Sequence, residues 1–429
     1  MKAFKIKEGM LLGVATAATQ IEGGKLDHSW MEWAKVKGHI ADGTSPECAD
    51  DHYSRVQEDT RLMKEMGLQI SRLGLEWARI EPEEGIYDEQ AVQHYMDEVT
   101  LLLSYGIKPL VTLHHFTNPM WFESKGAFEK IENIPCFLRF AEKMVMAFGD
   151  KVNEYITINE PNVYATNGYF FGSWPPGEKS FFKTVNVMSV MTVAHIKAYE
   201  KIHALNPNAR VSFANHMRVF APENPKNLKH RVFAKLTEQF FQGAMTKAMC
   251  KGEFAFPIRN IGHVKKGSYC DFIAVNYYTR STVSSLGDGV KKGAPINDLG
   301  WEIYPEGIVE CARKLHTLLP LPIYITENGT CDNTDAFRSR YIYDHLKAIS
   351  ESDLPIERYY HWSFTDNFEW AEGESARFGI VHVDYESQKR TIKNSGQFYS
   401  KIIANKGVTD DCYAQYIERE TYKTGDANE

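Results

Sequence analysis

Short apolar runs alternate with longer segments of helical periodicity along most of the chain. A short apolar run bounded by turn residues is typical of a strand that is buried on both faces of a sheet. Eight such runs predict strands, at residues 10–15, 70–75, 108–114, 155–159, 210–214, 272–276, 322–326 and 358–363. Strands that alternate with helices in this way favour βα units and a parallel sheet.

The helices between these strands carry start and stop signals. Residues 51–66 have acidic residues in the first half and basic residues later, and the pattern ends at Gly67. Residues 88–104 end before Gly106. Residues 134–148 begin with Pro at their second position and stop at glycine. Proline near the start and glycine just past the end are each expected at helix termini.

The order of these elements favours one α/β fold, a (β/α)8 TIM barrel with long βα loops. Neither a linker nor a low-complexity segment separates the eight βα pairs, although 429 residues could also form two or three domains. We expect a single catalytic domain over residues 1–429, with a core at about 10–403 and a tail at about 404–429. A doubly wound open sheet is the alternative. It would usually carry a glycine-rich phosphate turn after the first strand, and Gly13-Val14-Ala15 is not one.

Four longer irregular segments follow predicted strands, at residues 16–50, 116–133, 161–180 and 277–303. In a barrel they would be βα loops, which lie on the face where chemistry is done. We therefore expect functional residues at the carboxyl ends of the strands.

Composition and charge narrow the class of protein. The chain is 43% hydrophobic and 24% charged, which is ordinary for a globular protein with a large core. Its net charge of −7 argues against a nucleic-acid or anionic-membrane partner. The 8 Trp, 22 Tyr and 24 Phe suit either a core or a site that binds the C–H face of sugar rings. A homo-oligomer stays possible.

Cysteine usage predicts a cytoplasmic protein. The seven cysteines are scattered and never form a C-x-x-C pair, which suits reduced thiols better than disulfides or a zinc site. Three early lysines before the apolar residues 10–18 have the outline of a signal peptide. The apolar stretch runs straight into residues 19–24, however, which look like a strand end with site residues. No run approaches the ~20 apolar residues that a transmembrane helix needs.

Two glutamates hold equivalent places in the pattern. Glu160 and Glu327 each close an apolar run, stand beside an asparagine and come just before a chain-breaking residue. Two carboxylates delivered to one cleft are the minimum equipment for hydrolysis of a glycosidic bond. Either glutamate could instead cap a helix or pair with an arginine at a strand end.

The other strand ends are polar, rich in amides and aromatic. They carry Gln20, Arg72, His115, Asn159, Asn276, Tyr278, Trp362, Glu369 and Trp370. This set has no phosphate-binding nest and too few ligands for a metal, so we expect neither cofactor nor metal. In His114-His115 only one ring can face the cleft, because side chains alternate along a strand.

Taken in order, these segments resemble glycoside hydrolase family 1, the β-glucosidase family. The signature-like segments are Thr157-Ile158-Asn159-Glu160-Pro161 and Ile325-Thr326-Glu327-Asn328-Gly329. Segments 18–23, 71–80, 111–116, 362–370 and 377–385 also match, so the resemblance spans roughly residues 10–403. The chain departs from the commoner family motif at residues 73–77 and 115–117. These differences bear on fine substrate specificity more than on the catalytic chemistry.

The resemblance implies a retaining mechanism. Glu327 would be the nucleophile, kept charged by Arg72 and Tyr278, and Glu160 the acid/base, kept protonated by burial and by the charge of Glu327. Asn159 would bind the sugar 2-OH, or else act as an Asx cap, and Asn276 would support the pair. The two carboxyl groups are expected ~5–5.5 Å apart, the separation of retaining enzymes.

The remaining candidates would bind the sugar. The resemblance implies hydrogen bonds from Gln20, His115 and Glu369 to hydroxyl groups, with Trp362 under the ring and Trp370 at the pocket edge. An anion at Glu369 would repel a phosphorylated sugar, so a neutral terminal sugar is expected. The loop at residues 170–177 either lines the leaving-group side or is a surface turn.

The function expected from this resemblance is a retaining exo-β-D-glycosidase of the β-glucosidase type, acting on a small carbohydrate or glycoside through a covalent glycosyl-enzyme. A transglycosidase that passes the same intermediate to a sugar or lipid acceptor is the alternative. A sugar-binding protein that lost the chemistry would lack one glutamate, and both are present. The epimer of the terminal sugar (gluco, galacto or fuco) is left open.

Overall fold

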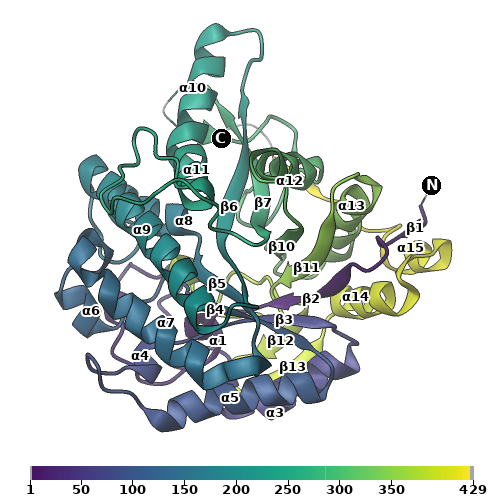
Figure 1. Ribbon diagram of the computed structural model, residues 1–429. Helices are drawn as coiled ribbons and strands as arrows, with labels where there is room; N and C mark the ends of the chain where they lie inside the picture. Colours follow the sequence, from purple (N-terminus) through teal and green to yellow (C-terminus); the bar gives the residue numbers. More distant parts are fainter. Residues whose placement is uncertain (1, 286, 426–429) are drawn as a thin grey trace.

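The structure is a computed structural model, which describes residues 2–285 and 287–425. Eight parallel strands close into a barrel, with helices around the outside (Figure 1). The barrel strands are β2 (Leu11–Ala15), β3 (Ile70–Gly74), β4 (Lys108–His114), β5 (Glu154–Asn159), β6 (Arg210–Pro222), β7 (Ile273–Val283), β10 (Ile323–Asn328) and β11 (Ile356–Trp362). Each pairs with its neighbours in chain order, and β11 pairs with β2 to close the ring. The predicted (β/α)8 barrel is confirmed.

Two strands are longer than the sequence predicted. β6 and β7 were expected to end at residues 214 and 276, but they stay paired in parallel as far as Pro222 and Val283. A register shift between Met217 and Val219 interrupts this extension. Polar residues such as Asn215 and His216 make the extension look like a loop in the sequence. The backbone pairing between two long neighbours nevertheless keeps it extended.

The three helices singled out in the sequence are present. They are α3 (His52–Glu65), α5 (Glu89–Ser104) and α7 (Ile134–Phe148). The Asp88 side chain caps α5 by accepting hydrogen bonds from two backbone N–H groups of the first turn. At the C-terminal end of α7, Gly149 takes a left-handed φ of 51°, which glycine adopts readily.

The remaining elements complete the outer layer and the loops. The longer helices are α9 (Phe181–Leu205), α10 (Leu228–Glu238), α11 (Ala244–Lys251), α12 (Glu306–Leu318), α13 (Arg338–Glu351) and α14 (Asn394–Asn405). The shorter ones are α1 (Ala18–Ile21), α2 (Ser29–Ala34), α4 (Trp77–Ile80), α6 (Met120–Ser124), α8 (Pro161–Ala165) and α15 (Asp410–Tyr416). Two π-helical turns, η4 (Thr166–Phe171) and η5 (Gln239–Gly243), follow α8 and α10.

Short strands pair outside the barrel. β1 (Phe4–Lys5) pairs with β14 (Gly407–Val408), β9 (Pro295–Ile296) with β15 (Lys423–Thr424), and β12 (Val381–Asp384) with β13 (Lys389–Ile392). β8 (Asp288–Gly289) adds to β7. Both β14 and β15 lie beyond residue 403, so this end of the chain is tied back to earlier segments.

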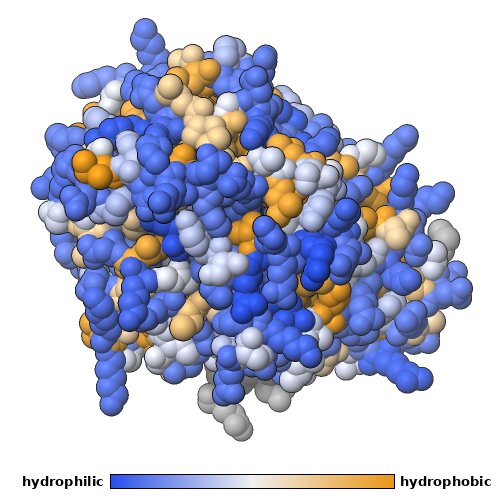
Figure 2. All heavy atoms as spheres, turned by 90° about the horizontal axis from the view of Figure 1, so that it is seen from below, coloured by the Kyte–Doolittle hydropathy of each residue, from blue (hydrophilic) through white to orange (hydrophobic). Residues whose placement is uncertain are grey.

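The core lies between the barrel wall and the helices. Strand residues such as Val14, Ile70, Val111 and Ile325 are fully buried. Seen from below, the surface is mainly hydrophilic, with small separate hydrophobic areas (Figure 2). In the described part of the chain, no helix has both the length and the apolar character to cross a membrane.

Candidate active site

The carboxyl ends of the barrel strands surround a pocket of about 310 Å³. Of the residues expected at the site, seven line it directly: His115, Glu160, Tyr278, Glu327, Trp362, Glu369 and Trp370. The other four, Gln20, Arg72, Asn159 and Asn276, lie behind this lining and hydrogen-bond to it. The structure therefore brings together all eleven residues that the sequence singled out.

Glu327 lies near the end of β10 and is almost fully buried. One carboxylate oxygen accepts a short hydrogen bond from Arg72 Nη1, and the other accepts one from the Tyr278 hydroxyl group. Charged and phenolic donors both favour an ionised carboxylate. The two partners expected for this glutamate are thus in contact with it.

Arg72 joins several strands beneath the pocket. Its guanidinium group is fully buried, and its Nε donates to Thr112 Oγ1 at 2.9 Å. Nη2 donates to Asn159 Oδ1 at 2.7 Å, while Nη1 reaches Glu327. Because the planar fork uses each nitrogen on a different strand, it fixes the orientation of Glu327 relative to β5.

Glu160 follows β5 and begins α8 with a left-handed φ of 41°. Such a conformation is strained for a residue other than glycine, and strained residues cluster at functional sites. Oε1 of Glu160 accepts hydrogen bonds from Asn276 Nδ2 at 2.8 Å and from His216 Nδ1 at 3.0 Å. Asn276 also donates to Asn159 Oδ1 at 3.0 Å, so the supports of the two glutamates form one network.

The pKa shifts of the two glutamates differ from the sequence-based expectation. Burial raises the pKa of Glu327 to about 7, and the charge of Glu160 adds to this, although Arg72 and Tyr278 lower it. Burial also raises the pKa of Glu160, but a positive charge on His216, together with hydrogen bonds from His216 and Asn276, lowers it below its usual value. The expected order is therefore reversed if His216 is charged.

The hydrogen bonds of His216 indicate that its ring is neutral. Arg218 Nε donates to His216 Nε2 at 3.2 Å, so Nε2 must keep its lone pair. The ring hydrogen then lies on Nδ1, the nitrogen that faces Glu160. A neutral ring removes the positive charge that lowers the pKa of Glu160. Burial, the largest influence on that carboxyl group, then favours its protonated form.

Neither His216 nor Arg218 was predicted as a site residue. Both lie on the part of β6 beyond the expected strand end, and both line the pocket. The polar pair Asn215-His216 directly after a buried run is the signal that could have identified this strand end. Trp174, from the loop at residues 170–177 that was considered for the leaving-group side, also lines the pocket. Trp301 lines it as well and was not assigned a role.

The half of the pocket away from Glu160 carries the groups expected to bind sugar. Gln20 Nε2 donates to Glu369 Oε2 at 3.2 Å, and its own Oε1 is buried without a partner among the described residues. Asn159 Nδ2 donates to His115 Nε2 at 2.9 Å, which leaves the hydrogen of this ring on Nδ1. Burial raises the pKa of Glu369 to about 8, and the charge of Glu327 contributes to the shift. Hydroxyl groups of a ligand can satisfy these atoms.

The aromatic rings of His115, Trp362 and Trp370 form the other wall of the pocket. His115 and Trp362 lie with centroids 5.9 Å apart and planes at 28°, and His115 and Trp370 are similarly arranged. The neighbouring His114 points the other way, as the alternation along a strand requires. Its Nε2 contacts Asn118 Oδ1 at 2.9 Å, among packed aromatic rings. Among the residues that the structure describes, no group of His, Cys, Asp and Glu is placed to hold a metal ion.

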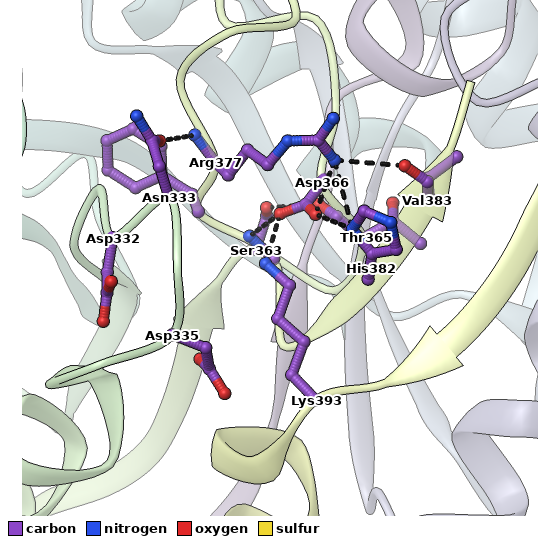
Figure 3. A network of polar contacts seen from close by, with 12 residues as sticks. Asp332, Asn333, Asp335, Ser363, Thr365, Asp366, Arg377, His382, Val383 and Lys393 are labelled. Carbon is purple, nitrogen blue, oxygen red and sulfur yellow. Dashed lines mark hydrogen bonds and ion pairs between the residues drawn. The ribbon is translucent and has the colours of Figure 1, made fainter. Parts of the chain in front are cut away.

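A charged network holds the loop that carries Glu369 and Trp370 (Figure 3). At its centre is Asp366, which accepts hydrogen bonds from Lys393 Nζ at 2.6 Å and Arg377 Nη1 at 3.0 Å. Although burial raises the pKa of Asp366, hydrogen bonding by His382 and the charge of Lys393 outweigh it and hold that pKa below its usual range. The loop is thus anchored to the β12–β13 hairpin and to α14.

Comparison with known proteins identifies this arrangement. A model of glycosyl hydrolase family 1 matches residues 3–408. The chain belongs to this family. Beta-glucosidase A of Thermotoga maritima is 31% identical over 447 residues, covering 96% of this chain and all of the relative. Like the family as a whole, the chain is a glycoside hydrolase, a retaining β-glycosidase that acts at the terminal sugar.

Solved structures agree with this family assignment. The β-glucosidase of Thermotoga maritima in complex with glucoimidazole superposes with a TM-score of 0.88 at 30% identity, covering 94% of this chain and all of that one. A β-glycosidase from Pyrococcus horikoshii gives a TM-score of 0.87 at 33% identity, with 96% and 98% coverage. The family fold therefore extends over nearly the entire glycosidase chain.

Proposed function

We propose that Glu327 is the nucleophile and Glu160 the acid/base of a β-glycosidase that releases a terminal, unphosphorylated sugar. The observation that carries this proposal is that the two buried glutamates have different hydrogen-bond partners. Glu327 contacts a guanidinium group and a phenol, whereas Glu160 contacts an amide and a histidine whose ring is neutral. Unequal surroundings are what give two carboxyl groups different roles.

In the first step, the ionised Glu327 attacks the anomeric carbon while Glu160 donates its proton to the departing oxygen. A covalent glycosyl ester forms and the leaving group departs with the proton. Arg72 orients the attacking carboxylate. The Tyr278 hydroxyl group, which bonds to the other oxygen of Glu327, stabilises charge on that oxygen until the ester forms.

In the second step, Glu160 removes a proton from water, and the oxygen of this water displaces Glu327 from the anomeric carbon. Formation of the ester has by then removed the charge of Glu327, which lowers the pKa of Glu160 and suits it to act as a base. Two displacements restore the original configuration, so the sugar is released as the β-anomer.

Asn159 is the group we assign to the sugar 2-OH. Its Oδ1 is occupied by Arg72 and Asn276, and its Nδ2 contacts His115, so its orientation is fixed on both sides. Contacts to the 2-OH strengthen as oxocarbenium character develops. A fixed amide of this kind stabilises the transition state without reorganising.

The preference for an unphosphorylated sugar rests on the whole pocket lining rather than on Glu369 alone. With a pKa of about 8, Glu369 is largely neutral in the empty pocket at neutral pH, so its charge by itself would repel a phosphate little. Four glutamates line the pocket, and Arg218 is the one Lys or Arg among its described lining residues. Since Arg218 contacts the partner of Glu160, a phosphate near Glu369 would be buried without a cation.

Azide rescue of two variants tests the assignment of roles. In Glu327→Gly, azide should attack in place of the carboxylate and give the α-glycosyl azide. In Glu160→Ala, azide should intercept the glycosyl-enzyme of an aryl glycoside and give the β-glycosyl azide. Product configuration by NMR distinguishes the two residues. Exchanged configurations, or wild-type turnover in either variant, would contradict the proposal.

A cytoplasmic location is also proposed, because of the cysteines. All seven are free thiols, and six are buried. Even Cys250 and Cys270, whose sulfur atoms lie 4.0 Å apart with Cys270 donating a hydrogen bond, are not joined by a disulfide. A thiol titration of the native and denatured protein from its own cells, giving seven free thiols on denaturation, would support this location.

A further inference from the structure

A second cavity, which we call the phenylalanine groove, adjoins the catalytic pocket. Its volume is about 530 Å³. Val163, Asn167 and Arg218 line both the groove and the pocket, so the two spaces share a wall. The proposed roles of Glu160 and Glu327 do not use this groove.

Phenylalanine is the commonest residue type in the lining of the groove. Seven of its fifteen lining residues are Phe. Phe181 stacks on Phe240 with centroids 5.6 Å apart, and Phe220 meets Phe241 edge-on at 5.7 Å. The outer rings remain in water: the exposed fractions of Phe171 and Phe256 are 58% and 84%. An exposed apolar cluster of this kind marks a binding surface more often than chance.

The groove lies on the same side of the pocket as Glu160. The backbone N–H of Val163 donates to the Glu160 carbonyl oxygen, and η4, with Phe170 and Phe171, continues the chain from there. On β6, His216 contacts Glu160 and Phe220 lines the groove. Both elements therefore lead from the acid/base group into the groove.

This placement decides which part of a substrate reaches the groove. Glu160 protonates the oxygen of the leaving group, so the leaving group must extend past Glu160 and away from Gln20 and Glu369. The groove is where that extension leads. The groove also carries polar residues, namely Thr166, Asn167, Arg218, Thr237 and Gln239. Its phenyl rings offer no hydrogen bonds, however, so a hydroxylated leaving group lying against them would lose its water without gaining partners from those rings.

We propose that the phenylalanine groove binds a hydrophobic aglycone, an alkyl chain or an arene, and that the natural substrate is a glycoside of such a group. This inference rests on the proposed roles of Glu160 and Glu327, because these roles define the leaving-group side. An aglycone that enters the groove covers rings that are otherwise exposed. That burial strengthens binding in proportion to the apolar area removed from water.

A series of n-alkyl β-glycosides, from methyl to octyl, tests the proposal below their micelle concentrations. The sugar is the one that the enzyme releases fastest from nitrophenyl β-glycosides. We expect kcat/KM to rise roughly two- to fourfold for each added methylene group, and about 100-fold or more in total. A disaccharide with the same terminal sugar should be a poorer substrate than the octyl glycoside.

A matched pair of exposed phenylalanines supplies the variants. Phe171→Ser removes a ring from the groove wall, and Phe182→Ser removes a ring that is 83% exposed and does not line the groove. We expect the ratio of kcat/KM for octyl over methyl glycoside to fall about tenfold in Phe171→Ser. The same ratio should be unchanged in Phe182→Ser. Both rings are exposed, so neither substitution should prevent folding.

The outcomes separate the two proposals. Hydrolysis of aryl and methyl β-glycosides with retention, but without a rise along the alkyl series, would overturn the groove assignment alone. Failure to hydrolyse any β-glycoside would overturn both. If the groove is instead an interface between copies of this chain, Phe171→Ser should convert a dimer to a monomer in sedimentation, with the octyl-to-methyl ratio unchanged. That result would also overturn the aglycone assignment.

Discussion

His216 decides how the two active-site glutamates share a proton. Arg72 and Tyr278 favour a charged Glu327, but burial outweighs them in the empty pocket and raises its pKa to about 7. Glu160 is the proton donor only while His216 stays neutral, and Arg218 enforces that state through Nε2. The contact between Arg218 and His216, two residues apart on β6, therefore determines which of the two glutamates donates the proton.

Loss of the His216 hydrogen bond should change the pH profile. Because this bond favours the charged form of Glu160, His216→Phe should raise the pKa of Glu160 and move the basic limb of kcat/KM to higher pH. A single hydrogen bond of about 1 kcal/mol corresponds to a shift of roughly 0.7 pH units. His216→Asn, whose amide can donate from a similar position, is the control and should keep the limb in place. A drop in kcat without any shift of the limb would assign His216 a packing role only.

The motif residues could be predicted from the sequence, but their ionisation could not. Glu160 and Glu327 stand at ends of apolar runs, and a strand end delivers its side chain to the pocket whatever lies elsewhere. Protonation depends instead on burial and on contacts between distant segments. His216 and Arg218 are an example: the polar pair Asn215-His216 could mark a strand end, but it does not show that His216 contacts Glu160 or that Arg218 contacts His216.

At the scale of elements, barrel strands were predictable wherever the apolar run and the strand coincide. β4, at Lys108–His114, agrees with the expectation at both ends. β6 and β7 do not, because their outer halves are polar and stay extended only by pairing with one another. Sequence periodicity reports burial of side chains, and it is silent on backbone pairing at a barrel rim. Of the phenylalanine groove, only the loop at residues 170–177 was considered for the leaving-group side, and Phe220 was missed because it lies on the extension of β6.

The loop after β11 depends on one buried carboxylate. Asp366 is fully buried and bonds to Lys393 and Arg377, so Asp366→Asn should leave their charges without a partner. Breaking a buried ion pair in this way costs about 3–5 kcal/mol. Urea denaturation should show a loss of this order, together with weaker substrate binding through displaced Glu369. Asp384→Asn, at an exposed position of β12, is the control and should change the urea midpoint little.

Protonation of the Asp366 carboxylate should make the stability of the folded protein sensitive to acid. Its pKa in the folded protein lies below the usual value, so its stabilisation is complete above the unfolded pKa of about 4. It is lost as the pH falls through the lower, folded pKa. At pH values below about 4, the urea midpoint of the native enzyme should therefore decrease as the pH is lowered. The urea midpoint of Asp366→Asn should decrease less steeply. Parallel curves for the two proteins would contradict this role.

At the scale of the whole molecule, charge and shape both select the substrate. The net charge of −7, and a pocket lining in which Arg218 is the one described Lys or Arg, oppose an anionic sugar, and the phenylalanine groove favours an apolar leaving group. The fold alone would not give this selection, since one barrel supports many specificities through its loops.

A panel of nitrophenyl β-glycosides tests the charge selection. We expect kcat/KM for the 6-phospho-glucoside to be at least about 100-fold below that of the best neutral sugar, the equivalent of roughly 3 kcal/mol for a buried and unpaired charge. The gluco, galacto, fuco and manno sugars in the same panel identify the preferred epimer. A fastest rate on the 6-phospho sugar would overturn the argument from the pocket lining.

The most direct test of the central claim is to trap the glycosyl-enzyme. A 2-deoxy-2-fluoro β-glycoside with a good leaving group should inactivate the enzyme, because fluorine slows both steps and the good leaving group speeds only the first. Mass spectrometry of the digested protein should find one sugar on the peptide that contains Glu327, and none on that peptide in Glu327→Gln. A sugar attached to Glu160, or the absence of any adduct on an inactivated enzyme, would contradict the assignment.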